Sequence, residues 1–271
     1  ITLGYGDNSS GRLTFSDAGD VSFTVNADFN IGYENSGGGT GLVEFFNGSR
    51  LTNLVVMQTF RLGDGNNTLG SFIATNAPGV AANIYLDDAF YVGSHADSGT
   101  VGGDSTGTVM FDVGGGYFGW STNLGDTFRV GHGRQDVNQP GRGLLMVSNF
   151  GLAELRGSYF EIGFLGGDAN RSTGIVEFVK GGAMLFSNQG VMTIGYGDNS
   201  YGRLTFDNVT NVNMILDWDG GENITIGGES SGGGVGVVEF TGGSRLTNFS
   251  TLGGLLIGHG AGASGTFIAT N

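Results

Sequence analysis

The sequence predicts an all-β fold, a right-handed parallel β-helix (β-solenoid) of nine coils of about 30 residues. Glycine makes up 56 of the 271 residues, and this disfavours helix because each glycine costs about 1 kcal/mol in a helix interior. The pattern apolar–x–apolar–Gly returns about every 30 residues, and a second apolar pattern follows it each time. Such spacing is typical of a solenoid, and parallel crossover connections are normally right-handed.

The first pattern marks the first strand of each coil. It occurs as ITLG, FNIG, FRLG, FYVG, FRVG, FEIG, MTIG, ITIG and LLIG, beginning at Ile1, Phe29, Phe60, Phe90, Phe128, Phe160, Met192, Ile224 and Leu255. Its closing glycine is expected where a turn needs positive φ or where the backbone comes too close for a Cβ. A phosphate-binding loop is disfavoured, because the lysine and following helix of a P-loop are missing.

The second pattern marks a second strand with one buried face, because apolar residues alternate along it. It begins with a glycine in every coil, as in GRLTF and GIVEF, and a looser third segment is clearest as NGSRLTN at 47–53 and GGSRLTN at 242–248. The fifth residue of the second pattern forms a predicted structural ladder of six phenylalanines: Phe15, Phe45, Phe111, Phe178, Phe206 and Phe240. Rows about 4.8 Å apart suit stacked rings.

A longer period lies above the coil. The two glycines of successive coils are separated by 7, 9, 7, 14, 12, 11, 7, 9 and 7 residues, so the last three coils repeat the first three. The chain is therefore predicted to be a single β-solenoid segment, 1–271, in which 1–191 is one six-coil unit and 192–271 the first half of the next. Neither end carries a predicted cap, which suggests a longer chain or stacking into a filament.

The phrase LTIGxxxSGxLTFxxGSxLTN, spelled across 192–206 and 242–248, resembles the repeats of type V secretion and PEP-CTERM-associated β-helix proteins. It is also similar to autotransporter-passenger-like surface proteins more broadly. The resemblance covers the whole chain and implies a right-handed β-helix outside a bacterial cell, with adhesive or structural roles. It brings no catalytic residues with it.

The composition limits the classes of partner that the chain is expected to bind. The formal net charge is −14, with a single lysine among 11 basic residues, so phosphates would repel the chain and nucleic acid is not an expected partner. The sequence has no run of 18 apolar residues, so membrane insertion of this segment is not expected. The chain has no cysteine, and together with the repeats this favours an extracellular or cell-surface location.

Three long turns in consecutive coils, 94–106, 132–142 and 164–173, form a candidate patch. This long-turn patch holds His95, Asp97, Asp104, Arg134, Asp136, Arg142, Asp168 and Arg171, together with His132. One interpretation is a polysaccharide-binding or polysaccharide-cleaving site, since β-helical enzymes of that kind gather acids and arginines on neighbouring coils. The other is that long turns simply accumulate polar residues, which the lack of any diagnostic spacing favours.

Five residues that follow first-strand glycines are candidates for contact with a glycan or a protein partner: Tyr5, Tyr33, His132, Phe164 and Tyr196. An exposed aromatic strip of this kind could stack on sugar rings or on another filament. The alternative is that each ring covers its own turn. No cofactor and no metal are expected, with calcium bridging by Asp7, Asp64 or Asp198 as the alternative.

The leading functional hypothesis is structural. Stacked coils would give a rigid, self-associating rod within an extracellular fibre or a bacterial cell-surface adhesin, with no enzymatic activity. Glu44, Glu177 and Glu239 share one outward column but avoid adjacent coils, as like charges should. The alternative hypothesis is the polysaccharide-binding or polysaccharide-cleaving β-helix with the long turns of coils four to six as its site.

Overall fold

The computed structural model is a parallel β-sheet wound into stacked coils, and the described residues contain strands and turns but no helix. Twenty-two strands are assigned among them, and their row-to-row pairings are parallel. The predicted fold class, an all-β solenoid, is therefore confirmed. The structure describes residues 1–34, 38–76, 79–95, 103–121, 126–133, 139–164, 171–216, 222–228 and 233–270.

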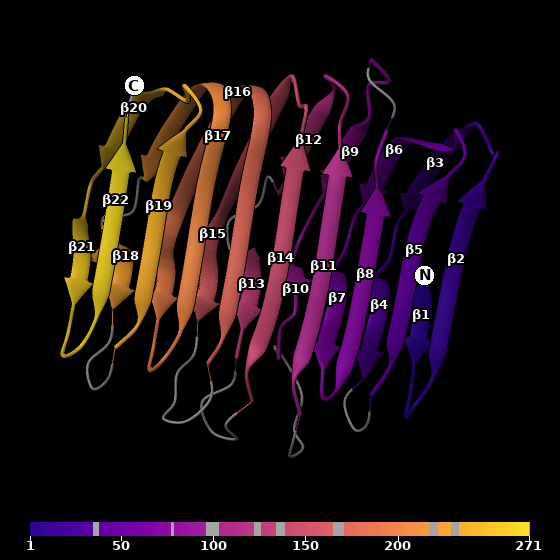
Figure 1. The fold of residues 1–271 in the computed structure, drawn as a ribbon, viewed down its shortest axis with the longest axis horizontal. Helices are drawn as coiled ribbons and strands as arrows, with labels where there is room; N and C mark the ends of the chain where they lie inside the picture. The colour runs from indigo at the N-terminus through magenta and orange to yellow at the C-terminus, as the bar shows by residue number, and fades with distance from the viewer. Residues whose placement is uncertain are drawn as a thin grey trace.

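The coil is right-handed (Figure 1). The second strands run upward on the near side, the first strands run downward behind them, and the chain advances from the indigo N-terminal end at the right to the yellow C-terminal end at the left. Upward motion in front and downward motion behind, combined with a leftward advance, describe a right-handed helix. This agrees with the usual handedness of parallel crossovers.

Three ladders of paired strands run along the stack. The first-strand ladder consists of β1 (Thr2–Tyr5), β4 (Phe29–Glu34), β7 (Phe60–Gly65), β10 (Phe90–Val92), β13 (Thr127–His132), the ends of β15 (Leu152–Phe164) and β16 (Thr173–Tyr196), β18 (Glu222–Gly228) and β21 (Gly254–His259). Its register follows the order of the repeats read from the sequence, one coil per row.

The second-strand ladder consists of β2 (Ser10–Ser16), β5 (Thr40–Phe46), β8 (Thr68–Ala74), β11 (Ser105–Asp112), β14 (Gly141–Ser148), the starts of β16 and β17 (Tyr201–Leu216), β19 (Val235–Thr241) and β22 (Ser264–Ala269). The third-strand ladder consists of β3 (Asp20–Val25), β6 (Arg50–Val56), β9 (Asn83–Leu86), β12 (Tyr117–Trp120), the start of β15, the middle of β16, the end of β17 and β20 (Leu246–Thr251). Among the described residues the third ladder is one row shorter than the other two.

The core lies between the ladders and is built from columns of stacked rings. Phe29, Phe60, Phe90, Phe128 and Phe160 are fully buried, and their successive ring centroids are 5.5, 5.6, 4.7 and 4.4 Å apart. These separations lie within or at the edge of the range that aromatic pairs prefer. The column therefore binds five consecutive rows through side chains as well as through backbone hydrogen bonds.

The second-strand phenylalanines stack in the same way where the column is continuous. Phe178, Phe206 and Phe240 have successive centroids 5.7 and 4.8 Å apart. The column is interrupted at Ala74, and there Phe72 of the same strand fills the gap, 6.1 Å from Phe45 and 5.3 Å from Phe111. In GSFIA the phenylalanine is therefore the third residue of the pattern and the alanine the fifth, so the ring lies one inward position away from the column and still fills the core.

The glycine that closes each first strand sits at a crowded corner. Its φ lies near +60° in every coil, from +56° at Gly63 to +67° at Gly131. A Cβ on Gly163 would overlap the carbonyl oxygen of Tyr201 in the next row. Both predicted reasons for this glycine, positive φ and close backbone approach, are confirmed.

Candidate functional site

The five candidate contact residues lie in one column on the outside of the first-strand ladder. Tyr5 and Tyr33 stack with centroids 5.8 Å apart, and His132, Phe164 and Tyr196 form a second stack with centroids 5.0 and 5.3 Å apart. Asp64 and Ser94 occupy the rows between the two stacks. We call these five side chains the ring column.

Most ring faces of the ring column are covered by neighbouring rings of the same column. The interplanar angles are 1° for His132–Phe164 and 9° for Phe164–Tyr196, so the middle ring has a neighbour on each face. A ligand that stacks on an aromatic ring needs a free face, whereas the outward parts of stacked rings are their edges. Tyr5, which is 59% exposed, has the most accessible ring of the column. Contact of the column with a glycan or partner stays a prediction.

His132 sits in a compact polar environment at one end of the second stack. Its Nε2 lies 3.5 Å from a carboxylate oxygen of Glu161, and that same oxygen accepts a 2.6 Å hydrogen bond from Arg129. The backbone N–H of buried His95 donates to the carbonyl oxygen of His132 at 3.0 Å. Burial lowers the pKa of His132 well below its usual range, and the charges of Arg129 and His95 lower it further. His132 is therefore a neutral imidazole at pH 7.

The outward first-strand residues beside the ring column were not singled out from the sequence. Arg61 lies between two tyrosine rings, 5.4 Å from the centroid of Tyr33 and 5.7 Å from that of Tyr91, and Arg129 lies 5.6 Å from Tyr91 on the next row. Arg61 also pairs with Asp28 at 3.1 Å. The sequence held one sign of these contacts: the second residue of the first strand is Arg, Tyr, Arg and Glu in four consecutive coils.

The described members of the long-turn patch do not converge on one point. His95 is buried, Asp104 and Arg142 form a 2.9 Å ion pair with side chains about half exposed, and Arg171 lies 5.4 Å from the ring of Tyr201. Exposed ion pairs contribute only about 0–1 kcal/mol. Asp97, Arg134, Asp136 and Asp168 lie outside the described residues. A polysaccharide site in this patch therefore stays a prediction.

The aspartates of the calcium hypothesis have different surroundings. Asp64 is buried with a carboxylate oxygen 3.4 Å from Nε of Arg61. Asp7 lines a hollow of about 610 Å³ together with Asn8, Ser9, Ser10, Gly38, Thr40 and Asn67. Calcium takes six to eight oxygen ligands, and the described part of the chain holds no group of three or more His, Asp or Glu side chains placed around one metal position. Calcium bridging, for which Asp198 was the third candidate, stays a prediction.

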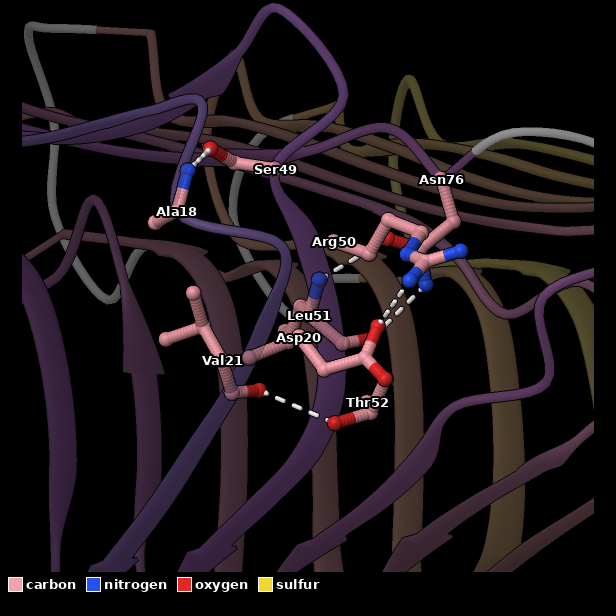
Figure 2. Close-up of polar contacts among 8 residues, drawn as sticks. All are labelled: Ala18, Asp20, Val21, Ser49, Arg50, Leu51, Thr52 and Asn76. Atoms are coloured by element: carbon pink, nitrogen blue, oxygen red, sulfur yellow. Dashed lines mark hydrogen bonds and ion pairs between the residues drawn. The ribbon is translucent and has the colours of Figure 1, made fainter.

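The repeated GSRLTN segment is a clamp between coils (Figure 2). Ser49 accepts a 2.9 Å hydrogen bond from the backbone N–H of Ala18, and Arg50 pairs with Asp20 at 2.6 Å, so both link the second coil to the first. Asn76 of the third coil completes the group, accepting from the N–H of Leu51 at 2.9 Å and donating to its carbonyl oxygen at 2.7 Å.

The threonine of the clamp is the extra residue of a β-bulge. Leu51 pairs with Val21 and Asn53 with Ser22, so Thr52 has no partner in the register, and its hydroxyl donates to the carbonyl oxygen of Val21 at 3.2 Å. The second copy repeats this arrangement. There Thr247 is the extra residue and donates to the carbonyl oxygen of Val212 at 3.0 Å, while Ser244 accepts from the N–H of Val209 and donates to the carbonyl of Phe206, both at 2.9 Å.

Comparison with family models, with curated proteins and with solved structures finds no match to this chain. Among the residues that the structure describes, none belongs to a helix with the length and apolarity that a membrane span requires. The repeated features of the chain, its corner glycines, ring stacks and bulged clamps, all make contacts from one row to the next.

Proposed function

We propose that this chain is a structural segment, a rigid β-solenoid rod that self-associates within an extracellular fibre or a cell-surface adhesin. The observation that supports it most is the continuity of row-to-row contact. Backbone ladders, the buried phenylalanine columns and the GSRLTN clamps each join a coil to its neighbour. Solenoids with such nearest-neighbour contacts are stiff along their axis and expose long lateral surfaces.

The rod hypothesis is tested by imaging native material and by diffraction from aligned samples. We expect rods or filaments with a reflection near 4.8 Å along the rod axis, since the rows repeat at that spacing, and an axial repeat of about 29 Å or a multiple if six coils form a unit. Antibody labelling of intact source cells should mark their surface. Compact, non-associating particles found only inside the cell would contradict the proposal.

The polysaccharide hypothesis is tested separately, by incubating the protein with acidic and neutral polysaccharides. We expect no new reducing ends and no unsaturated products. Product release that is lost in Asp97→Asn, Asp136→Asn or Asp168→Asn would assign an activity to the long-turn patch and overturn a purely structural role.

A further inference from the structure

The outer side of the second-strand ladder has an apolar middle. Six partly exposed apolar side chains form its middle: Leu42, Ile73, Met110, Leu144, Met146 and Ile175. They lie in neighbouring rows, since Ile73 pairs with Met110, Met110 with Met146, and Leu144 with Ile175. We call this side, from β2 to β19, the second-strand face.

The first-strand side is polar at the corresponding places, and the third-strand side is mixed. The first-strand side carries Arg61, Arg129 and Glu161. The third-strand side carries hydrogen-bonded asparagines, with Asn83 donating to Asn53 at 3.0 Å, but also the partly exposed apolar residues Leu185 and Ile215. Continuous apolar patches are uncommon on soluble monomers and usually mark contact sites, so the second-strand face is suited to a protein partner.

Charged pairs border the apolar middle at both ends. At one end Arg12 of β2 pairs with Glu44 of β5, and at the other Arg203 of β17 pairs with Glu239 of β19 at 2.8 Å. Burial lowers the pKa of Arg203, but its hydrogen bond to Glu239 and the charges of Glu239 and Glu177 raise it overall. Glu177 therefore lies close to the same end.

The order of these charges is self-complementary. In the two central outward columns of the face, the rows read base (Arg12), acid (Glu44), three uncharged rows (β8, β11 and β14), acid (Glu177 in β16), base (Arg203) and acid (Glu239). A half-turn about an axis between β11 and β14, parallel to the strands, places the row of Arg12 over that of Glu239 and the row of Glu44 over that of Arg203. It also places Met110 over Met146.

We propose that the second-strand face is a homodimer interface, in which two copies of this chain pack face to face with their rod axes antiparallel. Each end of the interface would hold four alternating charges, Arg12 and Glu44 from one copy with Arg203 and Glu239 from the other. Sheets packed face to face lie about 10 Å apart with interdigitated side chains. An isologous contact of this kind closes after two copies.

The face is large enough for a stable dimer. Seven row spacings of about 4.8 Å and strands of seven residues at about 3.3 Å each span about 34 by 23 Å, or roughly 800 Å² per partner. A standard specific interface also buries about 800 Å² per partner. A parallel arrangement of the two copies is less favourable, because it would set three carboxylates against apolar residues of the other copy: Glu44 against Leu42, Glu177 against Ile175 and Glu239 against Val237. The antiparallel arrangement sets one carboxylate, that of Glu177, against an apolar residue, Ile73.

This inference rests on the proposed function in one respect, that the rods self-associate. Sedimentation velocity of the 271-residue chain should give twice the 27.9 kDa of one chain. Met110→Lys/Met146→Lys should halve that mass with an unchanged β-sheet circular dichroism spectrum. Met57→Lys/Leu252→Lys, which adds the same charge at exposed apolar residues outside the face, should remain dimeric.

The antiparallel orientation is tested with single cysteines, since the chain has none of its own. Thr108 would lie about one row, near 5 Å along the axis, from its counterpart across the interface, and Thr14 about seven rows, near 34 Å. A short bismaleimide should therefore cross-link Thr108→Cys into dimers and leave Thr14→Cys uncoupled. Equal cross-linking of both variants would overturn the antiparallel arrangement.

The remaining outcomes separate this inference from the proposed function. Assembly that survives the double lysine variant would overturn the second-strand face as the interface and leave a self-associating rod in place. A wild-type chain that stays monomeric at all concentrations tested would overturn both.

Discussion

The corner glycines show how strongly one backbone position can constrain the rod. Gly163 combines φ of +60° with an approach to Tyr201 that leaves no space for a Cβ. Gly115, in the turn between β11 and β12, also has positive φ, but nothing lies within 4 Å of its Cβ position. The two positions therefore separate the cost of the backbone conformation from the cost of crowding.

We expect Gly163→Ala to destabilise the chain more than Gly115→Ala. An L-residue with left-handed φ costs about 1–2 kcal/mol, and this is the whole effect expected at Gly115. At Gly163 the displaced neighbouring row adds to it. Urea unfolding of both variants measures the difference, and equal losses of unfolding free energy would show that the row can move aside.

His132 makes stability depend on pH. Its pKa is lowered in the folded state by burial and by Arg129 and His95, whereas an unfolded histidine titrates near pH 6.5. Below that pH the unfolded chain binds more protons than the folded chain, so unfolding free energy falls as pH falls, by at most about 1.4 kcal/mol per pH unit for one group.

We expect His132→Phe to flatten this dependence between pH 7 and 5 while it preserves the stack on Phe164. His259→Gln, which removes an exposed histidine, is the matched control and should keep the wild-type dependence. Unfolding midpoints at several pH values give the answer. A wild-type slope in His132→Phe would assign the acid sensitivity to other groups.

At the scale of the element, the bulged clamp explains why GSRLTN occurs twice. A bulge leaves one residue out of register and disturbs the ladder, and in both copies the threonine hydroxyl binds the carbonyl oxygen of the preceding row. The buried serine satisfies a backbone N–H of that row. The motif therefore specifies a turn between the second and third strands that is hydrogen-bonded to the preceding row.

We expect Ser244→Ala to lower unfolding free energy by about 1–3 kcal/mol, because it leaves the N–H of Val209 buried and unpaired. Ser264→Ala, at an exposed serine in β22, should change stability by less than about 0.5 kcal/mol. Chemical unfolding compares the two. A neutral Ser244→Ala would mean that water replaces the hydroxyl.

Much of the fold could be predicted from the sequence, because each coil repeats the same alternation and the same corner glycine. The clamp chemistry could not be predicted: the bulge shows as a spacing of three between buried Leu51 and Leu54, but that spacing does not say which backbone groups the serine and threonine bind. The stacking in the ring column could not be predicted either. Both faces of the Phe164 ring are covered, by His132 and Tyr196, and this depends on the side-chain angles in neighbouring rows. The second-strand face was partly visible as spaced glutamates, but its apolar middle appears only when outward residues of five rows are seen together.

At the scale of the whole molecule, the core is least covered at the two ends of the stack. Phe15 and Phe23 in the first coil are half-buried, and Ile257 in the last coil is 45% exposed, whereas Phe90 and Phe128 in the middle are fully buried. Contacts in a solenoid are confined to neighbouring rows, so each outer row has half the support of an inner one.

We therefore expect amide hydrogen exchange of these 271 residues to be graded along the axis. Amides of β1 to β3 and of β20 to β22 should exchange fastest, and those of β11 and β14 slowest, because local opening is easiest where apolar burial is least. Mass spectrometry of peptic fragments resolves these segments. Uniform protection from end to end would show that the stack opens only as a whole.

The first turn of each coil absorbs length without disturbing the stack. Gly93 and Gly107 are separated by twice as many residues as Gly63 and Gly70, yet β11 pairs with β8 and β14 without a shift of register. Foreign peptides grafted at this turn should therefore leave the pitch unchanged. Copies grafted into successive coils would project from one edge as an evenly spaced array, which suits the molecule to multivalent antigen display.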